Sequence, residues 1–211
     1  MNTLQIKSPL NPKLEVAVYQ GHFATRHCHN NYYIDITRMK HEHDMAREAA
    51  MTIAKRYSYT KMIDTIVCLD GSEVIGTFLA FHMSRKGSYY INENKSINVV
   101  TPEFDQDEQP FFRDNLIPMI EGKHVLLLIS TVKSGKTIAR TLACMEEHGA
   151  EVQGIATVFS TAEVLDGIPV YSLLTTKDLP DYQCTDAESC PMCKAGKKID
   201  AIANSYGLSK L

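Results

Sequence analysis

The segment best suited to chemistry is a short polar loop between an apolar run and a helical pattern. It consists of Lys133, Ser134, Gly135, Lys136 and Thr137, and it follows the apolar residues 125–129. Small residues let successive backbone N–H groups face an anion, and a helix N-terminus adds favourable partial charge. The loop therefore predicts phosphate binding. The simpler alternative is a polar strand-to-helix turn with Thr137 near the cap.

The same loop is one residue short of a nucleotide-binding P-loop. Residues 130–137 read S-x-x-x-x-G-K-T, where the P-loop pattern begins with the glycine that wraps the phosphates. The loop also follows roughly the third predicted strand. The run "IVCLD" at 66–70, which could end in a metal-binding Asp, comes before the loop and not after it. A P-loop-like NTPase or kinase is the least favoured of the functions considered.

A second group of reactive residues lies near the C-terminus. Cys190 and Cys193 form a CxxC pair, and Cys184 precedes them by six residues. Such spacing can direct sulfurs at one tetrahedral metal, and zinc favours thiolates. We expect a structural zinc ion, with a fourth ligand from residues 27–29 and Cys28 among the candidates. A redox pair and unligated thiols are the alternatives. The remaining histidines are expected to be surface or capping residues: His22, His41, His43, His82, His124 and His148.

Composition bounds the class of protein. The chain has 211 residues, of which 44% are hydrophobic and 22% charged, an ordinary globular balance. The net charge of −3 means that the chain lacks the excess of positive charge typical of nucleic-acid-binding proteins. Apolar runs fall short of the ~20 residues that span a bilayer, and the first residues lack the apolar core of a signal peptide. We expect a cytoplasmic protein, without membrane or nucleic-acid partners, whose cysteines are thiols or metal ligands.

Hydrophobic periodicity predicts alternating strands and helices. Helices are expected at 43–57, at 71–83 with Ser72 as N-cap, and from 137 to about 148. Strands are expected at 32–37, 65–69, 88–92, 125–129, 151–159 and 167–174, with a long acidic loop at 93–115. This order predicts an α/β fold with a parallel-centred sheet of about five strands and helices on both faces.

Several of these segments together resemble type I phosphoribosyltransferases. The stretch "VLLLISTVKSGKTIARTLACMEEHGAEVQGIATVF" (125–159) is similar to the family's phosphoribosyl diphosphate-binding strand, loop and helix, including its "GA-x-V-x-G" turn. The segments "GHFATRHCHNNYYIDIT" (21–37) and "GIPVYSLL" (167–174) resemble the orotate branch. The matches follow the family's order over most of residues 20–175.

The resemblance implies a domain plan and an activity. Residues 1–42 would begin a small hood subdomain, residues 43–180 would form the α/β core, and residues 181–211 would pack on the hood as a Cys-containing tail. The family joins a nitrogenous base to phosphoribosyl diphosphate with Mg²⁺, and orotate enzymes are homodimers. A phosphorylated ribose or nucleotide is the implied ligand.

The motif nevertheless departs from the family. Its two acidic residues, which hold the ribose hydroxyls, align with Ile129 and Ser130. Its pyrophosphate loop aligns with Asp70, Gly71 and Ser72, and Lys95 is the nearest basic residue to its flexible loop. We therefore expect transfer to be slow or absent. A non-catalytic sensor or partner subunit that binds a nucleotide is the alternative to a transferase.

Overall fold

A computed structural model of the chain describes residues 2–204 and 206–211. Its central sheet has the strand order β10-β11-β9-β8-β4-β5. Five of these strands run parallel, and the short β10 pairs antiparallel with β11 at one edge. Their bounds are Thr65–Leu69 (β4), Asn98–Val100 (β5), His124–Val132 (β8), Glu151–Ser160 (β9), Val164–Leu165 (β10) and Ile168–Thr175 (β11). The predicted parallel-centred α/β sheet is confirmed.

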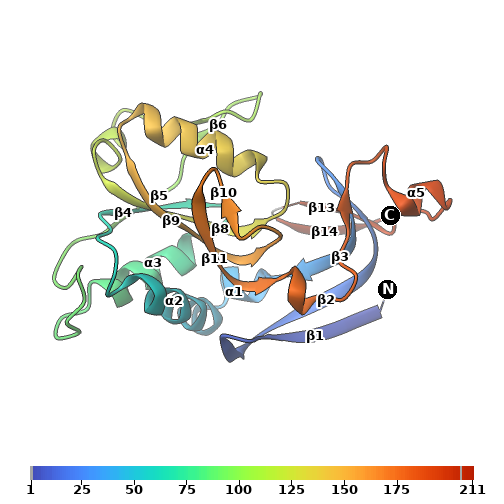
Figure 1. Cartoon of the computed structure of the whole chain (residues 1–211), viewed down its shortest axis with the longest axis horizontal. Helices are drawn as coiled ribbons and strands as arrows, with labels where there is room; N and C mark the ends of the chain where they lie inside the picture. Colours follow the sequence, from blue (N-terminus) through green and yellow to red (C-terminus); the bar gives the residue numbers. More distant parts are fainter. Residues whose placement is uncertain (1, 205) are drawn as a thin grey trace.

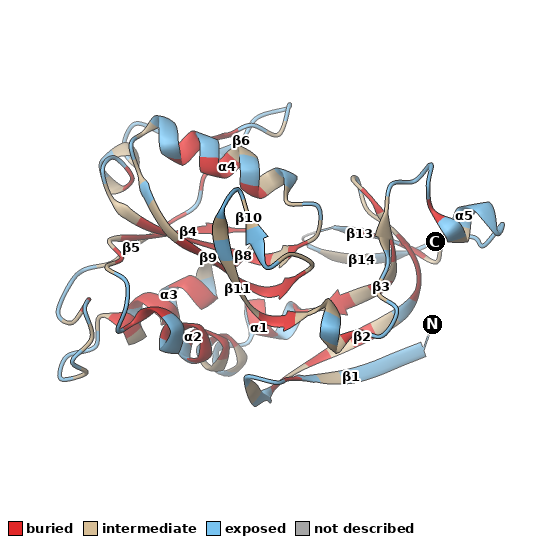
Figure 2. Cartoon of the chain, in the orientation of Figure 1, coloured by how far each residue is buried: buried red, intermediate tan, exposed pale blue. Residues whose placement is uncertain are grey.

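Helices cover both faces of this sheet (Figure 1). Helices α2 (His43–Tyr57) and α3 (Glu73–Met83) lie on one face, and α4 (Lys136–Glu147) lies on the other. Alternate strand residues divide between the two sides: Leu126 and Leu128 pack toward α2 and α3, while Val125 and Leu127 pack toward α4. Strands buried on both faces read as continuous apolar runs, as "TIVCL" and "VLLLI" do. Figure 2 shows the resulting buried centre.

A second sheet forms the hood and combines both ends of the chain. Its strand order is β12-β3-β2-β13-β14, with β1 also pairing with β2. The early strands are Asn2–Ser8 (β1), Asn11–Ala24 (β2) and His29–Asp35 (β3), and the late strands are Cys184–Thr185 (β12), Ala201–Asn204 (β13) and Gly207–Lys210 (β14). The tail thus lies against the N-terminal segment, as Figure 1 shows on the right. The exact domain boundaries at 42 and 180 stay predictions.

Short elements complete the chain. They are α1 (Thr37–His41), β6 (Glu103–Phe104), β7 (Pro110–Phe111), η1 (Ile117–Met119), η2 (Thr176–Asp178) and α5 (Pro191–Lys194). Strands β6 and β7 form a hairpin inside the predicted 93–115 loop. In the described part of the chain, no helix is both long and apolar enough to cross a membrane.

One predicted strand is wrong. Residues 88–92 form turns, with Tyr89 at φ 59° and 90% exposed. The segment is instead fixed by Asn92, whose buried side chain accepts the Ile63 N–H and donates to the Lys61 carbonyl. A side chain bonded to a neighbouring backbone stabilises an irregular path that β-propensity does not reveal. Conversely, the 14-residue β2 was not anticipated.

Candidate functional site

A cavity of about 270 Å³ opens at the carboxyl ends of β4 and β8. Its lining combines the end of each strand with the turn that follows β2 and with the end of β13. Ligands of open α/β sheets bind outside the carboxyl ends of the strands, where successive loops diverge. The cavity is therefore bounded by the core on one side and by the hood on the other.

The predicted phosphate loop forms part of the cavity wall. Lys133, Ser134, Gly135 and Thr137 line the cavity, whereas Lys136 faces an adjoining open hollow of about 550 Å³. Gly135 is the N-cap residue of α4 and has φ 74°. The first N–H groups of a helix have no intrahelical acceptor, so those that follow Gly135 are suited to bind an anion.

Lys133 is set between acidic groups at the base of this loop. Burial lowers the pKa of Lys133, while Cys28, Cys184 and Asp70 oppose that shift through their negative charge. The side chain therefore brings a cation close to the loop without projecting into open solvent. This placement agrees with an anion site, because a desolvated positive charge acts more strongly on a ligand than an exposed one.

The ribose side of the motif has no carboxylate. Ile129 is 3% exposed and packs with the α4 core, while its edge lines the cavity. Ser130 is 2% exposed, and its hydroxyl donates to the Asp70 carbonyl at 3.3 Å. Thr157 donates to the Ser130 carbonyl at 3.2 Å. These two positions are built into the sheet and offer no anion to ribose hydroxyls.

The predicted pyrophosphate loop follows β4, and its residues face two different places. Asp70, at φ 55°, lines the cavity. Ser72 is buried, occupies the N-cap of α3 and donates to the Leu128 carbonyl at 3.0 Å, so it faces β8. Its predicted place at the helix start holds, but its side chain makes no capping bond. Gly71 has φ 73°, and a Cβ there would lie 2.8 Å from Cε of Lys40.

Lys40 is a basic residue near the Asp70 turn that no local pattern predicts. Its side chain crosses Gly71, and it lines a small hollow beside the cavity. Burial lowers the pKa of Lys40, and the charges of Asp70 and Glu73 oppose that shift. Burial also raises the pKa of the Asp70 carboxyl, although the positive charges of Lys40 and Lys133 act to lower it. The two lysines therefore offset the repulsion that Asp70 and Glu73 would exert on a phosphate.

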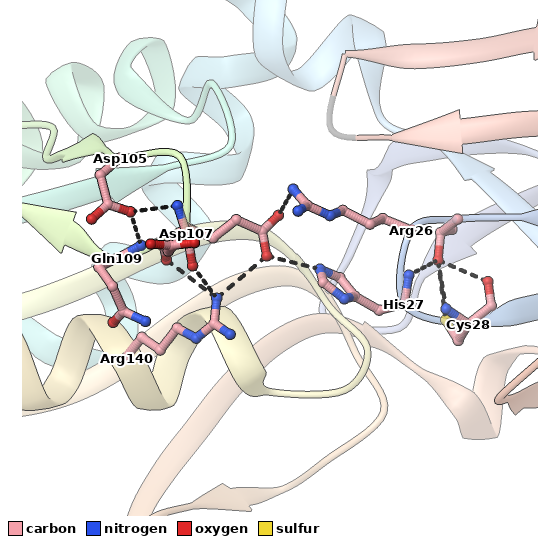
Figure 3. A network of polar contacts seen from close by, with 9 residues as sticks. Arg26, His27, Cys28, Asp105, Asp107, Gln109 and Arg140 are labelled. Atoms are coloured by element: carbon pink, nitrogen blue, oxygen red, sulfur yellow. Dashed lines mark hydrogen bonds and ion pairs between the residues drawn. The ribbon is translucent and has the colours of Figure 1, made fainter.

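An acidic side chain bridges the cavity rim. Glu108, on the β6–β7 loop, pairs with Arg26, with His27 Nε2 at 3.6 Å and with Arg140 Nη1 at 3.3 Å. Figure 3 shows Arg26 and His27 on the hood side of this network and Arg140 on the other, beside the loop that carries Asp105 and Asp107. One carboxylate thus joins the hood, the hairpin loop and α4.

Asp105 shapes the loop that presents Glu108. Its Oδ1 accepts the N–H groups of Asp107 at 2.9 Å and Gln109 at 2.8 Å. The basic residue expected near this loop is elsewhere. Lys95 acts electrostatically on Asp64, which precedes β4 at the opposite edge of the sheet. The assignment of Lys95 to the flexible loop is wrong, because the 85–97 segment follows α3 back to the amino ends of the strands.

The tail cysteines separate into two groups. Cys28 and Cys184 contact each other, with 2.9 Å between their sulfurs. A thiol hydrogen bond from Cys184 lowers the pKa of Cys28 and raises that of Cys184. Strand β12 brings them together by pairing Cys184 with Asn30 of β3. Two of the four predicted zinc ligands therefore lie side by side next to Lys133.

Cys190 and Cys193 meet two histidines instead. The ligand atoms of His22, His29, Cys190 and Cys193 all lie within 4.8 Å of one another. Among the described residues, this is the one group of His, Cys, Asp and Glu side chains close enough to hold a metal ion. The expectation that His22 is a surface or capping residue is wrong, since it is fully buried. The signal that could have found it is the seven-residue spacing of His22 and His29, taken together with the distant CxxC pair that needs further ligands.

Comparison with known proteins places the chain in a family. A family model described as a phosphoribosyl transferase domain matches residues 35–173. The chain belongs to this family. The matched segment runs from the end of β3 to β11 and so includes the central sheet, the Asp70 turn and the loop at 133–137.

Solved structures agree on the fold. An orotate phosphoribosyltransferase from Mycobacterium tuberculosis H37Rv, in complex with Fe(III) dicitrate, is 18% identical, with 78% of this chain and 93% of that chain covered and a TM-score of 0.54. The same enzyme in complex with 5-phospho-alpha-D-ribosyl 1-diphosphate is 17% identical, with coverages of 70% and 82% and a TM-score of 0.51. UMP synthase from Leishmania donovani is 17% identical, with coverages of 77% and 34% and a TM-score of 0.56.

Proposed function

We propose that this protein binds phosphoribosyl diphosphate or a nucleoside monophosphate in the cavity between core and hood. The 5-phosphate would lie on the loop 133–137. The supporting observation is that loop's arrangement: Gly135 in the left-handed region, the start of α4 behind it and Lys133 beside it. The related orotate enzyme solved with 5-phospho-alpha-D-ribosyl 1-diphosphate supports the ligand class.

The same cavity argues for slow transfer to a base. The transition state of phosphoribosyl transfer carries positive charge on the sugar, and a nearby carboxylate stabilises such charge. Removing one preorganised group of this kind costs about 10²–10³ in rate. Ile129 and Ser130 leave the ribose side neutral. Binding without efficient turnover, as in a sensor or partner subunit, follows from this chemistry.

Asp70 supports a second candidate, a transferase of the orotate kind. Its carboxyl lines the cavity and is the group placed to act on the sugar or on a metal. Mg²⁺ is commonly held by one or two carboxylates together with substrate phosphates. Asp70 fits such an ion, whereas Glu108 is held by Arg26, His27 and Arg140. Bound Mg²⁺ would neutralise pyrophosphate charge, and Asp70 would orient it.

Calorimetry and a turnover assay test these functions together. We expect phosphoribosyl diphosphate or a nucleoside monophosphate to bind, with and without Mg²⁺, and orotate transfer to stay well below an ordinary ~10 s⁻¹. Turnover near that value, abolished by Asp70→Asn, would establish the transferase and show that Asp70 replaces the missing acidic pair. If none of these ligands binds, both candidate functions are refuted.

The cellular setting and the oligomeric state belong to the same proposal. We propose a cytoplasmic setting because the cysteines are expected to be thiols or metal ligands, which a reducing environment maintains. The homodimer is inferred from the resemblance to orotate enzymes. We propose both as part of the same function, and the assembly is open to a direct measurement.

A further inference from the structure

Four metal-binding side chains from three separate segments converge in the hood. His22 lies in β2, His29 begins β3, and Cys190 and Cys193 flank the first turn of α5. The two histidines are seven residues apart, whereas Cys193 follows His29 by 164 residues. Loops that met by chance would not be expected to direct two imidazoles and two sulfurs at one point, so their convergence needs a physical cause.

The separations between these atoms are close to those of a tetrahedral shell: two lie within its range and two are slightly shorter. His22 Nε2 lies 3.0 Å from His29 Nδ1 and 3.6 Å from each of the two sulfurs, and Cys193 Sγ lies 3.2 Å from His29 Nδ1. Zinc bonds of about 2.0–2.3 Å place tetrahedral ligands about 3.3–3.8 Å apart. Hydrogen bonds could explain single contacts, but one central ion explains all of them.

The surroundings of His22 orient its free nitrogen toward the group. Nδ1 faces the carbonyl oxygens of Lys197 at 2.9 Å and Lys198 at 3.2 Å. Carbonyls only accept hydrogen bonds, so a neutral His22 carries its proton on Nδ1 and leaves the Nε2 lone pair toward the sulfurs. Metal-bound histidines typically donate their other N–H to a carbonyl or carboxylate in this way.

We propose that His22, His29, Cys190 and Cys193 bind one zinc ion. Two imidazoles and two thiolates are a donor set that zinc prefers, and four protein ligands leave no open position for a substrate. The ion is therefore structural. This set differs in part from the one expected from sequence: His29 comes from the expected segment 27–29 in place of Cys28, and His22 replaces Cys184.

The ion would hold the hood wall of the cavity. The His22 N–H donates to Asp200 at 2.7 Å, and the Asp200 N–H donates to the His22 carbonyl at 2.8 Å. Strand β13 follows and pairs with β2 at Ala201 and Phe23. Its last residues, Ala203 and Asn204, line the cavity. A metal at His22 thus fixes both the tail strand and the turn opposite the phosphate loop.

Metal analysis of the full chain tests the proposal. Protein purified without chelator, or stripped and reloaded with Zn²⁺, should hold one zinc per chain by elemental analysis. Co²⁺ in its place should give the intense visible bands of a tetrahedral site and a thiolate charge-transfer band. Zinc well below one per chain after reloading, with all tail thiols freely titratable, overturns the proposal.

Matched variants test the ligand set. Cys193→Ser, at an exposed position, and His29→Gln should lose zinc and increase hydrogen exchange in β13 and in residues 22–29, with the central sheet unchanged. Cys184→Ser and Cys28→Ser should keep the full zinc content, because these thiols lie outside the group. Zinc that survives Cys193→Ser, or that is lost in Cys184→Ser, shows that the proposed ligands are wrong.

Discussion

At the scale of single residues, Gly135 combines two constraints that other residues cannot meet. Its φ of 74° disfavours any side chain, and a Cβ there would lie 3.0 Å from Leu165 Cδ2. Gly135→Val should therefore deform the loop and weaken nucleoside monophosphate binding at least ~10-fold, about 1.4 kcal/mol, as measured by calorimetry. Gly122→Val is the control, because Gly122 has φ 63° with open space around it. Equal losses in both variants would contradict a specific role for the loop.

Asp64 supplies a residue-scale test of stability against pH. Burial alone would raise the pKa of Asp64, but hydrogen bonds from the backbone N–H and ring of His124 outweigh it, so the pKa lies below its ordinary value. A carboxyl with a lowered folded pKa stabilises the protein above its unfolded pKa of about 3.9, and that stabilisation disappears as pH falls through the folded pKa.

Asp64→Asn should accordingly destabilise the protein by about 1 kcal/mol at pH 7, with the difference from wild type shrinking below about pH 4. Urea unfolding at both pH values measures this. The exposed Asp114→Asn serves as the control for general charge effects. A pH-independent difference would show that the carboxylate charge is not what matters.

At the scale of elements, the β6–β7 loop is held over the cavity by Glu108. Arg26, Arg140 and His27 contact this carboxylate, so it competes with any anionic ligand for the two arginines. Glu108→Gln should raise the affinity for inorganic phosphate roughly two- to ten-fold, on the order of 1 kcal/mol. It should also increase hydrogen exchange in residues 103–111.

Glu103→Gln is the matched control on the same hairpin. Glu103 pairs with Arg113 at 2.8 Å but does not line the cavity. Its loss should loosen the hairpin without changing phosphate affinity. If both variants changed affinity alike, the effect would come from loop order or net charge and not from release of Arg26 and Arg140.

At the scale of the whole molecule, we propose the outer face of α3 as the contact surface of a homodimer. Val74 and Phe81 are seven residues apart on this helix and are 38% and 64% exposed. Positions seven apart lie on one helical face, and exposed aromatic groups favour association. We expect a homodimer at micromolar concentration by light scattering.

Phe81→Glu should convert that dimer to a monomer, because it places a charge at the centre of an apolar contact. Leu10→Glu, in the β1–β2 turn, tests whether any exposed apolar residue would do the same. If the wild-type protein is a monomer, the homodimer inferred from the resemblance to orotate enzymes is wrong. A dimer that tolerates Phe81→Glu would place the interface elsewhere.

The local pattern was enough to predict the core. Helix 43–57 and strand 65–69 match the structure residue for residue, because the helix buries one apolar stripe and the strand is buried on both faces. The loop at 133–137 was also visible, since strand, small polar residues and helix are consecutive in the chain. Residues 88–92 were not, because a single buried Asn92 overrides their β-propensity.

Contacts between distant segments were decided by the tertiary structure alone. Sequence spacing marked Cys184, Cys190 and Cys193 as one cluster, but strand pairing sends Cys184 to Cys28 and leaves the CxxC pair to His22 and His29. In the same way, Arg26 and Glu108 meet at the cavity rim from distant segments, and Lys40 reaches the hollow beside the cavity. A side chain's neighbours across a sheet depend on strand order and register, and no local pattern encodes these. The sequence by itself determined the family, the core and the strand-loop-helix arrangement around residues 133–137, and the packing of the two chain ends determined what faces that loop.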